Sequence, residues 1–276
     1  MPEGDTIKRA EATLAPLLVG RKLAAVYDHG LRRGALAGRT VEAVRAVGKH
    51  LLVELEGGFT IRVHLGIAGA WRRRRAAELR ETEARAATLA LVTDEDALLA
   101  VKARAAEIVR TAFVHAHPAL TALGPDLLGE GALDLPAIVA RARARAEAEP
   151  TLTVGELLLD QRVAAGLGNV YKSELCFLAR LHPHTRAAHL TDDKVAELYA
   201  RGAALLRANV GPWPRTTTAN RARGALPARG RGRYFVYGRA RRPCTVCGVQ
   251  IVRVLDGAET PRPTYFCPSC QPPPAR

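Results

Sequence analysis

The first third of the chain changes from a helical pattern of apolar residues to an alternating one. Apolar positions near the amino terminus repeat at helical spacing, at Ile7, Ala10, Leu14 and Leu17–Leu18. Between residues 50 and 65 apolar and polar positions alternate, with Gly57–Gly58 placed as a hairpin turn. The same pattern predicts strands at Leu23–Tyr27, Val41–Val47, His50–Leu55, Phe59–Leu65, Thr88–Val92, Ala97–Val101 and Ile108–Val114. We therefore expect one helix followed by an antiparallel β-sandwich.

The pattern becomes helical after the Pro/Gly-rich connector that starts at His117–Pro118. Asp134 is placed to cap a helix that ends before Pro150. Further helices are expected at Val154–Ala165, Val170–Arg180 and Asp192–Asn209, and a final hairpin at Gln250–Leu255 and Thr264–Phe266. These patterns predict an α+β multidomain protein with domains at residues 1–116, 117–240 and 241–276.

Two cysteine pairs close the chain. Cys244 and Cys247 form one C-x2-C pair, and Cys267 and Cys270 form another after 19 intervening residues. This spacing lets two knuckles bind one Zn²⁺ tetrahedrally, although disulfides or free thiols are the alternatives. With four cysteine ligands and no open position the zinc would be structural. The fifth cysteine, Cys176, lies in an apolar stretch and is expected in the core.

The charge of the chain favours a polyanionic partner. Its net charge is +14, and the stretch between Glu197 and Asp256 carries twelve arginines and no acidic residue. A basic segment next to a metal-binding module suggests a region that binds nucleic acid. Arg72–Arg75 is interpreted as a solvated basic loop. No apolar run approaches the length of about 18 residues that spans a membrane, and no leader precedes the first helix, so we expect a cytoplasmic protein.

A pair of glycines interrupts the helical region. At Gly166 and Gly168 one helix ends and another begins at once, which would present N–H groups to a phosphate beside Asn169 and Lys172. On glycine spacing alone, an ordinary helix-terminating turn is the simpler interpretation. A dinucleotide-binding fold is excluded because the third glycine and the preceding strand are missing.

Five segments, in this order, resemble the formamidopyrimidine-DNA glycosylase and endonuclease VIII family of base-excision repair enzymes. They are Met1–Thr6, Val47–His50, the linker His117–Pro118 with Leu123–Leu128, the helix, two turns, helix element at Leu158–Pro183, and the cysteine module. The resemblance covers essentially the whole chain. It implies a β-sandwich catalytic domain, a helix-two-turns-helix domain, a zinc ribbon, and damaged double-stranded DNA as the partner.

The resemblance gives the first residues a catalytic role. Once Met1 is removed, Pro2 carries a secondary amine that can attack a sugar C1′ and form an iminium ion. Glu3 supplies a carboxyl group for general-acid chemistry. The alternative is a surface carboxylate that only stabilises the first turn of the helix. Many relatives have a second glutamate where this chain has Thr6, and Asp5 is not assigned that role.

Other residues are assigned to DNA by the same resemblance. Lys49 matches a lysine that contacts the phosphate beside the lesion and assists elimination, although a solvated strand-end lysine is the alternative. Arg262 falls where relatives grip a phosphate, with Arg253 as its competitor. Ile67 lies in the loop that fills the space left by an everted base, and core burial is its alternative.

The resemblance implies a bifunctional DNA glycosylase and abasic-site lyase, which we expect to act as a monomer. Pro2-Glu3-Gly4 and His117–Pro118 resemble the endonuclease VIII branch, which implies oxidised pyrimidines as substrates. Two alternatives stay open: an oxidised-purine glycosylase for 8-oxoguanine or formamidopyrimidine, and a DNA-damage-binding protein on the same fold without chemistry.

Overall fold

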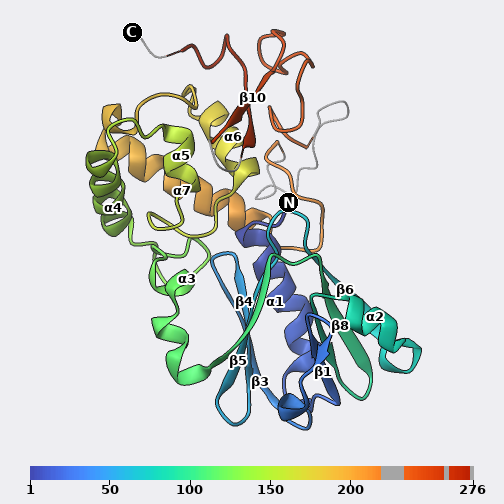
Figure 1. The fold of residues 1–276 in the computed structure, drawn as a ribbon. Helices are drawn as coiled ribbons and strands as arrows, with labels where there is room; N and C mark the ends of the chain where they lie inside the picture. The colour runs from blue at the N-terminus through green and yellow to red at the C-terminus, as the bar shows by residue number, and fades with distance from the viewer. Residues whose placement is uncertain (219–232, 258–260, 274–276) are drawn as a thin grey trace. The chain divides into compact units, whose positions relative to one another are not determined.

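A computed structural model describes residues 1–218, 233–257 and 261–273 (Figure 1). The chain divides into two compact units, Met1–Ala122 and Leu123–Arg276, which are described separately. The second unit contains both the helical region and the cysteine module. The division into three domains at residues 116 and 240 stays a prediction.

The first unit is an antiparallel β-sandwich with helix α1 (Gly4–Leu18) packed on β3 and β4. Its sheets have the orders β2-β1-β7-β8-β6 and β3-β4-β5-β9. The strands are β1 (Ala25–Asp28), β2 (Leu31–Arg32), β3 (Val41–Val47), β4 (His50–Leu55), β5 (Phe59–His64), β6 (Ala70–Arg75), β7 (Leu89–Val92), β8 (Asp96–Val101) and β9 (Ala105–Arg110). One apolar core includes residues of α1 and both sheets. The predicted helix and sandwich are confirmed.

Three short helices lie between strands of this unit, η1 (Gly34–Leu36), η2 (Ala76–Glu78) and α2 (Glu81–Ala86), and two more follow β9, η3 (Thr111–Ala116) and α3 (Pro118–Thr121). Strand β9 therefore stops at Arg110, and the residues expected to continue it to Val114 form η3 instead. In β5 the face that carries Thr60 and Arg62 is buried as well as the face that carries Ile61.

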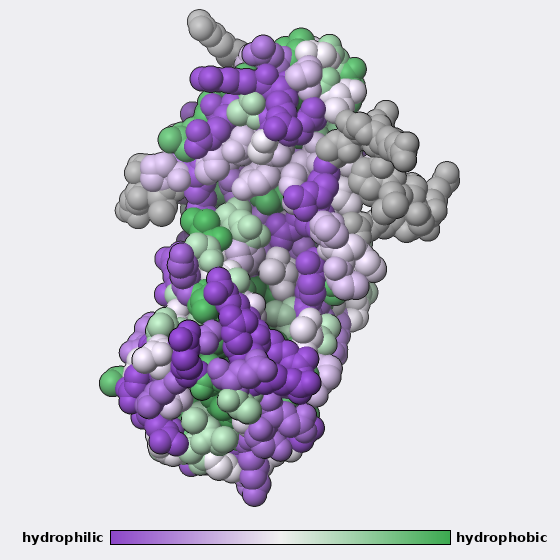
Figure 2. Space-filling model, turned by 90° about the vertical axis from the view of Figure 1, so that its right-hand side faces the viewer, coloured by the Kyte–Doolittle hydropathy of each residue, from purple (hydrophilic) through white to green (hydrophobic). Residues whose placement is uncertain are grey.

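The interpretation of Arg72–Arg75 as a loop is wrong, because these residues form most of β6. The strand pairs with β8 at the edge of its sheet, and its arginines are exposed. An edge strand tolerates charged side chains that prevent pairing with other chains, so it lacks the apolar alternation of inner strands. Hydrophilic residues predominate on the face that carries β6 and α2 (Figure 2).

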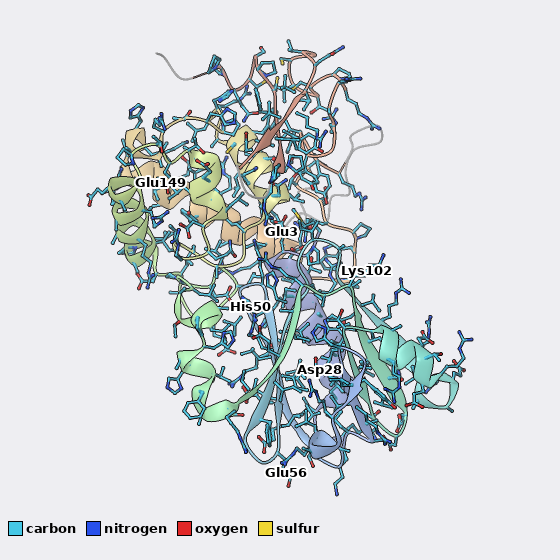
Figure 3. The ribbon with its side chains drawn as sticks, in the orientation of Figure 1. Glu3, Asp28, His50, Glu56, Lys102 and Glu149 are labelled. Carbon is cyan, nitrogen blue, oxygen red and sulfur yellow. The ribbon has the colours of Figure 1, made fainter. Side chains whose placement is uncertain are left out.

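Strand register brings three connections to one end of the four-stranded sheet. His50 is opposite His64, and His64 is opposite Ala105. The Gly48–Lys49 turn, the loop after His64 and the turn before Ala105 therefore lie at the same end. Figure 3 labels Glu3 and His50 toward this end of the unit and Glu56 at the opposite end. The ends of β4, β5 and β9 thus gather the candidate residues of this unit.

The second unit contains helices α4 (Leu135–Ala148), α5 (Val154–Leu159), α6 (Asn169–Leu178) and α7 (Asp192–Ala208), with η4 (Ala187–His189) before α7 and the hairpin β10 (Val252–Asp256) and β11 (Arg262–Phe266). Asp134 Oδ1 accepts the Ala137 N–H at 2.9 Å, which confirms the predicted cap. Helix α5 ends at Leu159, six residues before the predicted end at Ala165. The Asp160 side chain accepts the Arg162 N–H, and such local bonds compete with helical ones.

Helix α6 is the centre of this unit. Nearly every residue of α6 is buried, and Cys176 is in the apolar core, as predicted. Burial raises the pKa of the Cys176 thiol to about 12. The carboxylate of Glu174 is fully buried and accepts four hydrogen bonds, from Thr217 Oγ1 and from the backbone N–H groups of residues 235, 236 and 237. These bonds attach the chain before the cysteine module to α6.

Within the part of the chain that the structure describes, no helix has the length and apolar character needed to cross a membrane.

Candidate functional site

The catalytic candidates of the first unit are at the start of α1. Glu3 is the N-cap residue with extended backbone, and it is fully buried, whereas Pro2 before it is half-buried. Glu3 and Thr6 form a reciprocal capping box. The Glu3 N–H donates to Thr6 Oγ1 at 3.3 Å, and the Glu3 carboxylate accepts the Thr6 N–H. Thr6 therefore holds the acid candidate Glu3 at the start of α1.

Lys49 occupies the second position of the turn between β3 and β4. Val47 and His50 pair across this turn, and Gly48 has a φ of +57°, a left-handed conformation that favours glycine. Lys49 is half-buried and directly precedes β4, as predicted. The tight turn fixes the position of its backbone at the end of the sheet.

A polar network crosses the sheet beside Lys49. Arg62 donates to His50 Nδ1 at 2.7 Å and forms an ion pair with Glu107 at 2.8 Å. Glu107 is also 2.9 Å from His117 Nε2. Burial, together with nearby His64 and other positive groups, lowers the pKa of His50 to about 3. His50 is therefore neutral at physiological pH, and its Nδ1 is the acceptor for Arg62.

This network lines a hollow of about 370 Å³ at the end of the sheet, whose walls are His50, Arg62, His64, Arg104, Ala105, Glu107 and Ala119. We did not single out Arg62 or Arg104 from the sequence. The alternation in β5 placed Arg62 opposite the apolar face, and nothing local indicates that its partner Glu107 is 45 residues away. Register between β5 and β9 brings the two side chains together.

Ile67 lies in the loop between β5 and β6, and its side chain is 59% exposed. Its alternative assignment as a core residue is therefore wrong. The loop is tight: a Cβ atom at Gly69 would lie 2.2 Å from the Leu65 carbonyl oxygen, so only glycine fits there. An exposed apolar side chain on a short, fixed loop is free to contact another molecule.

The two turns between α5 and α6 are built around Gln161. Its side-chain amide donates to the carbonyl oxygens of Leu159 and Leu167 at 2.8 and 3.0 Å, and it accepts the Gly166 N–H at 3.1 Å. Gly166 has a φ of +121°, and Gly168 is the N-cap of α6. This geometry confirms the predicted break between two helices. The glycine pattern alone did not indicate the role of Gln161.

Asn169 and Lys172 are buried beneath strand β11. Asn169 Nδ2 donates to the Pro263 carbonyl oxygen, and Lys172 Nζ donates to Thr264 Oγ1. Their exposed fractions are 1% and 2%. The structure therefore brings both residues to the ribbon hairpin, and whether either contacts a phosphate stays a prediction.

Arg262 is the first residue of β11 and is half-exposed. It lines a hollow of about 450 Å³ together with Lys172, His184 and residues of α5 and β10. Its competitor Arg253 is exposed on β10, opposite Tyr265 in the hairpin. The two arginines thus occupy different positions of the ribbon, and only Arg262 lines the hollow with Lys172.

The four cysteines of the ribbon are positioned to hold a metal ion. All four Sγ atoms lie within 4.8 Å of one another, with 3.9 Å between Cys244 and Cys270 and 3.4 Å between Cys247 and Cys267. Tetrahedral Zn–S bonds of about 2.3 Å require Sγ separations of about 3.8 Å, so the set fits one zinc ion. The Cys270 N–H points to Cys267 Sγ at 3.4 Å, which suits a thiolate ligand.

Comparisons with known proteins agree across the chain. Residues 1–107 match the formamidopyrimidine-DNA glycosylase N-terminal domain, and residues 128–218 match the formamidopyrimidine-DNA glycosylase H2TH domain. A probable endonuclease 8 2 of Streptomyces coelicolor is 40% identical, with 100% of this chain and 95% of that protein covered. The formamidopyrimidine-DNA glycosylase of Thermus thermophilus is 34% identical, with 98% of each chain covered.

Two further relatives support the same assignment. The DNA-(apurinic or apyrimidinic site) lyase Nei2 of Mycolicibacterium smegmatis is 34% identical over 98% of this chain and 99% of its own. A Lactococcus lactis Fpg, solved in complex with DNA containing an abasic site, has a TM-score of 0.78 at 24% identity, covering 98% of this chain and 100% of that one, and shares the fold. The chain therefore belongs to the formamidopyrimidine-DNA glycosylase and endonuclease 8 family of DNA-repair glycosylases and abasic-site lyases.

Proposed function

We propose that this protein is a bifunctional DNA glycosylase and abasic-site lyase that removes oxidised bases from double-stranded DNA, acting as a cytoplasmic monomer. The observation that carries the proposal is the arrangement at the head of α1. A fully buried carboxyl group, Glu3, directly follows the residue that becomes the terminal amine. A nucleophile beside a shielded acid suits cleavage of an N-glycosidic bond.

The chemistry follows from these two groups. The Pro2 nitrogen forms a bond to C1′ of the damaged nucleotide while the bond from C1′ to the base breaks, and the base leaves with a proton from Glu3. Loss of the amine proton and opening of the sugar ring give an iminium ion at C1′. The iminium acidifies the C2′ proton, whose removal expels the 3′ phosphate. A second elimination then expels the 5′ phosphate, and water releases Pro2.

The remaining site residues are proposed to hold DNA. Lys49, directly before β4, would neutralise the phosphate beside the lesion, and Ile67 would fill the space left by the everted base. In the second unit Arg262 would bind a phosphate. Asn169 and Lys172 would support the hairpin strand that carries Arg262. The exposure of Ile67 and the half-exposure of Arg262 support these roles.

Zinc is the proposed ligand of the four cysteines, and its role is structural. The ion would link the two ends of the ribbon, and no reaction step passes through it. The small apolar cluster of this region includes Cys244, Cys267 and Cys270 themselves, which supports a fold that depends on the metal.

Oxidised pyrimidines are the proposed substrate class. The opening Pro2-Glu3-Gly4 supports this choice, and so does the 40% identity to a protein named endonuclease 8 against 34% to one named formamidopyrimidine-DNA glycosylase. Oxidised purines are the alternative. Duplexes that carry thymine glycol, dihydrouracil or 8-oxoguanine separate the two, because excision of 8-oxoguanine faster than both pyrimidine lesions would exclude the pyrimidine assignment.

Borohydride trapping tests the proposed chemistry. A protein with Met1 removed should form a covalent adduct with abasic DNA, since borohydride reduces the iminium. Protein that retains Met1 should lose most of the adduct and still bind DNA. Glu3→Gln is the matched variant: base excision should fall far more than cleavage at a preformed abasic site, where no base must leave. Full trapping with Met1 retained would exclude Pro2 as the nucleophile, and DNA binding without any trapping would support the non-enzymatic alternative.

A further inference from the structure

One face of α6 holds three consecutive residues of β11. Asn169, Lys172 and Ser173 have the i, i+3, i+4 spacing of a single helix face. Asn169 Nδ2 donates to the Pro263 carbonyl oxygen, Lys172 Nζ donates to Thr264 Oγ1, and Ser173 Oγ accepts the Tyr265 N–H at 3.4 Å. The helix therefore attaches the strand residue by residue, directly after Arg262.

The contact of Lys172 is unusual because both partners are buried. Lys172 is 2% exposed, and Thr264 is 0% exposed. Removing a lysine from water is costly unless its donors are bonded, so a lysine at this position must be held by its surroundings. Its bond to a hydroxyl of the ribbon joins two segments that lie 92 residues apart in the sequence.

Thr264 lies two residues after Arg262 in β11. Side chains at i and i+2 of a strand point to the same face, so the Arg262 and Thr264 side chains lie on one face of β11. Lys172 and Arg262 also line the same hollow of about 450 Å³. A shift of Thr264 away from α6 would move the base of the Arg262 side chain with it.

We propose that Lys172 is a positioning residue for Arg262: by holding Thr264, it orients the guanidinium that grips a DNA phosphate. The proposal rests on the proposed role of Arg262 in DNA binding. It differs from direct phosphate binding by Lys172, in which the lysine charge would act independently of the arginine.

A double-mutant cycle on duplex DNA with a stable abasic-site analogue tests the proposal. Arg262→Ala, Lys172→Met and Thr264→Val should each weaken binding about tenfold, as expected for loss of one charge-assisted contact. Each should flatten the slope of log affinity against log salt by about 0.9, since one phosphate contact is lost. Lys172→Met added to Arg262→Ala should weaken binding no further, within about twofold, since both changes remove the same contact.

Matched controls separate positioning from charge and from folding. Thr264→Ser keeps the hydroxyl and should bind the duplex with the same affinity and the same salt slope as the unchanged protein. Lys194→Met removes a lysine that pairs with Glu197 on α7 and should leave the slope unchanged. Zinc content and circular dichroism of each variant show whether the ribbon is intact.

Additive losses in the double variant, with a slope lower by about two units, would show that Lys172 binds a phosphate itself and would overturn the inference. Unchanged binding by Thr264→Val would overturn it as well. Unchanged binding and slope in Arg262→Ala would instead refute the phosphate contact on which the inference rests. Failure of the unchanged protein to form a borohydride adduct would refute the proposed activity and leave the position of Lys172 untouched.

Discussion

Thr6 shows how a single side chain can replace a family feature with a different physical role. The resemblance to the family implies a second glutamate at this position, and a threonine cannot supply that carboxyl group. Here its hydroxyl accepts the Glu3 N–H, and the Glu3 carboxylate accepts the N–H of Thr6. The residue therefore stabilises the first turn of α1 and restrains the position of Glu3.

Replacement of Thr6 by valine should test this restraint. Thr6→Val keeps the shape and removes the acceptor, which should lower the free energy of unfolding by about 1 kcal/mol. Base excision should fall several-fold, with little change in cleavage at a preformed abasic site, because only the first step needs Glu3 as an acid. Single-turnover rates on the two substrates measure this difference, and Thr6→Ser is the control. Equal losses on both substrates would contradict a role through Glu3.

At the scale of residues, the sequence indicated which residues are candidates for the site but not which polar side chains are buried. The roles of Pro2, Glu3 and Lys49 rest on the resemblance and stay predictions, whereas the exposure of Ile67 excludes its burial in the core. The burial of Arg62 and Lys172 was not predicted, because each depends on a distant partner, Glu107 or Thr264. Buried polar side chains are generally hydrogen-bonded, and here the fold brings each of them its partner.

At the scale of elements, strands with regularly spaced apolar residues were predicted accurately, whereas exposed elements and helix ends were not. The predicted limits of β3 and β4 are those of the structure, because both strands place regularly spaced apolar residues in the core of the sandwich. Edge strand β6 was missed because its arginines are exposed, and the end of α5 was misplaced because Asp160 starts a turn. The ribbon strands β10 and β11 differ from prediction by two residues at their starts.

The sheet that carries Lys49 should lose stability in mild acid. The folded protein holds His50 neutral, with its pKa lowered to about 3, whereas the unfolded chain binds a proton near the ordinary value of 6.5. Stability from this group is therefore fully present above pH 6.5 and is lost progressively as the pH falls towards 3. Between pH 6.5 and about 5, carboxyl groups contribute little to this change.

Thermal unfolding measured across that interval checks the expectation. His50→Gln can still accept the Arg62 hydrogen bond but does not titrate, so its midpoint should fall less with decreasing pH than that of the unchanged protein. His29→Gln, at an exposed position, is the control and should retain the full dependence. Parallel curves for the His50 variant and the unchanged protein would show that His50 does not titrate on unfolding.

The ribbon provides a second prediction at this scale. Because three of the four cysteines that are positioned to hold a metal belong to its apolar cluster, loss of the metal should unfold the ribbon locally. Cys267→Ser should release zinc and abolish duplex binding, while the circular dichroism of the helices and sandwich is retained. Cys176→Ser, at a cysteine outside the ribbon, should keep the zinc. Absence of zinc from the unchanged protein would contradict the metal assignment.

At the scale of the whole molecule, charge is segregated along the chain. Twelve of the arginines lie between Glu197 and Asp256, and four of these, Arg221, Arg223, Arg229 and Arg231, lie outside the described residues. For these four arginines, the basic segment that first indicated a polyanionic partner remains a sequence-based prediction. The family relationship supports the same partner by an independent route.

The salt dependence of duplex binding and the rate of excision should depend on different residues, Arg262 in the second unit and Ile67 in the first. Arg262→Ala should flatten the salt dependence of duplex binding by about 0.9 without reordering preference among lesions, because phosphate contacts do not specify sequence. Ile67→Ala should leave the salt slope unchanged and slow excision from duplex DNA, since an apolar wedge contributes no charge. Binding titrations at several salt concentrations and single-turnover excision measure the two effects. A change of lesion preference in Arg262→Ala would contradict this division.

The four hydrogen bonds to Glu174 have a consequence for evolution of the chain. Thr217 and residues 235–237 are attached to one carboxylate, so the two ends of the intervening stretch are fixed at a common point on α6. Replacement of Glu174 would leave all of these donors without their acceptor at once, because the four bonds end on one side chain. Position 174 should therefore accept few other residues during evolution, because only a buried side chain with two acceptor oxygens can bind Thr217 and the backbone of residues 235–237 together.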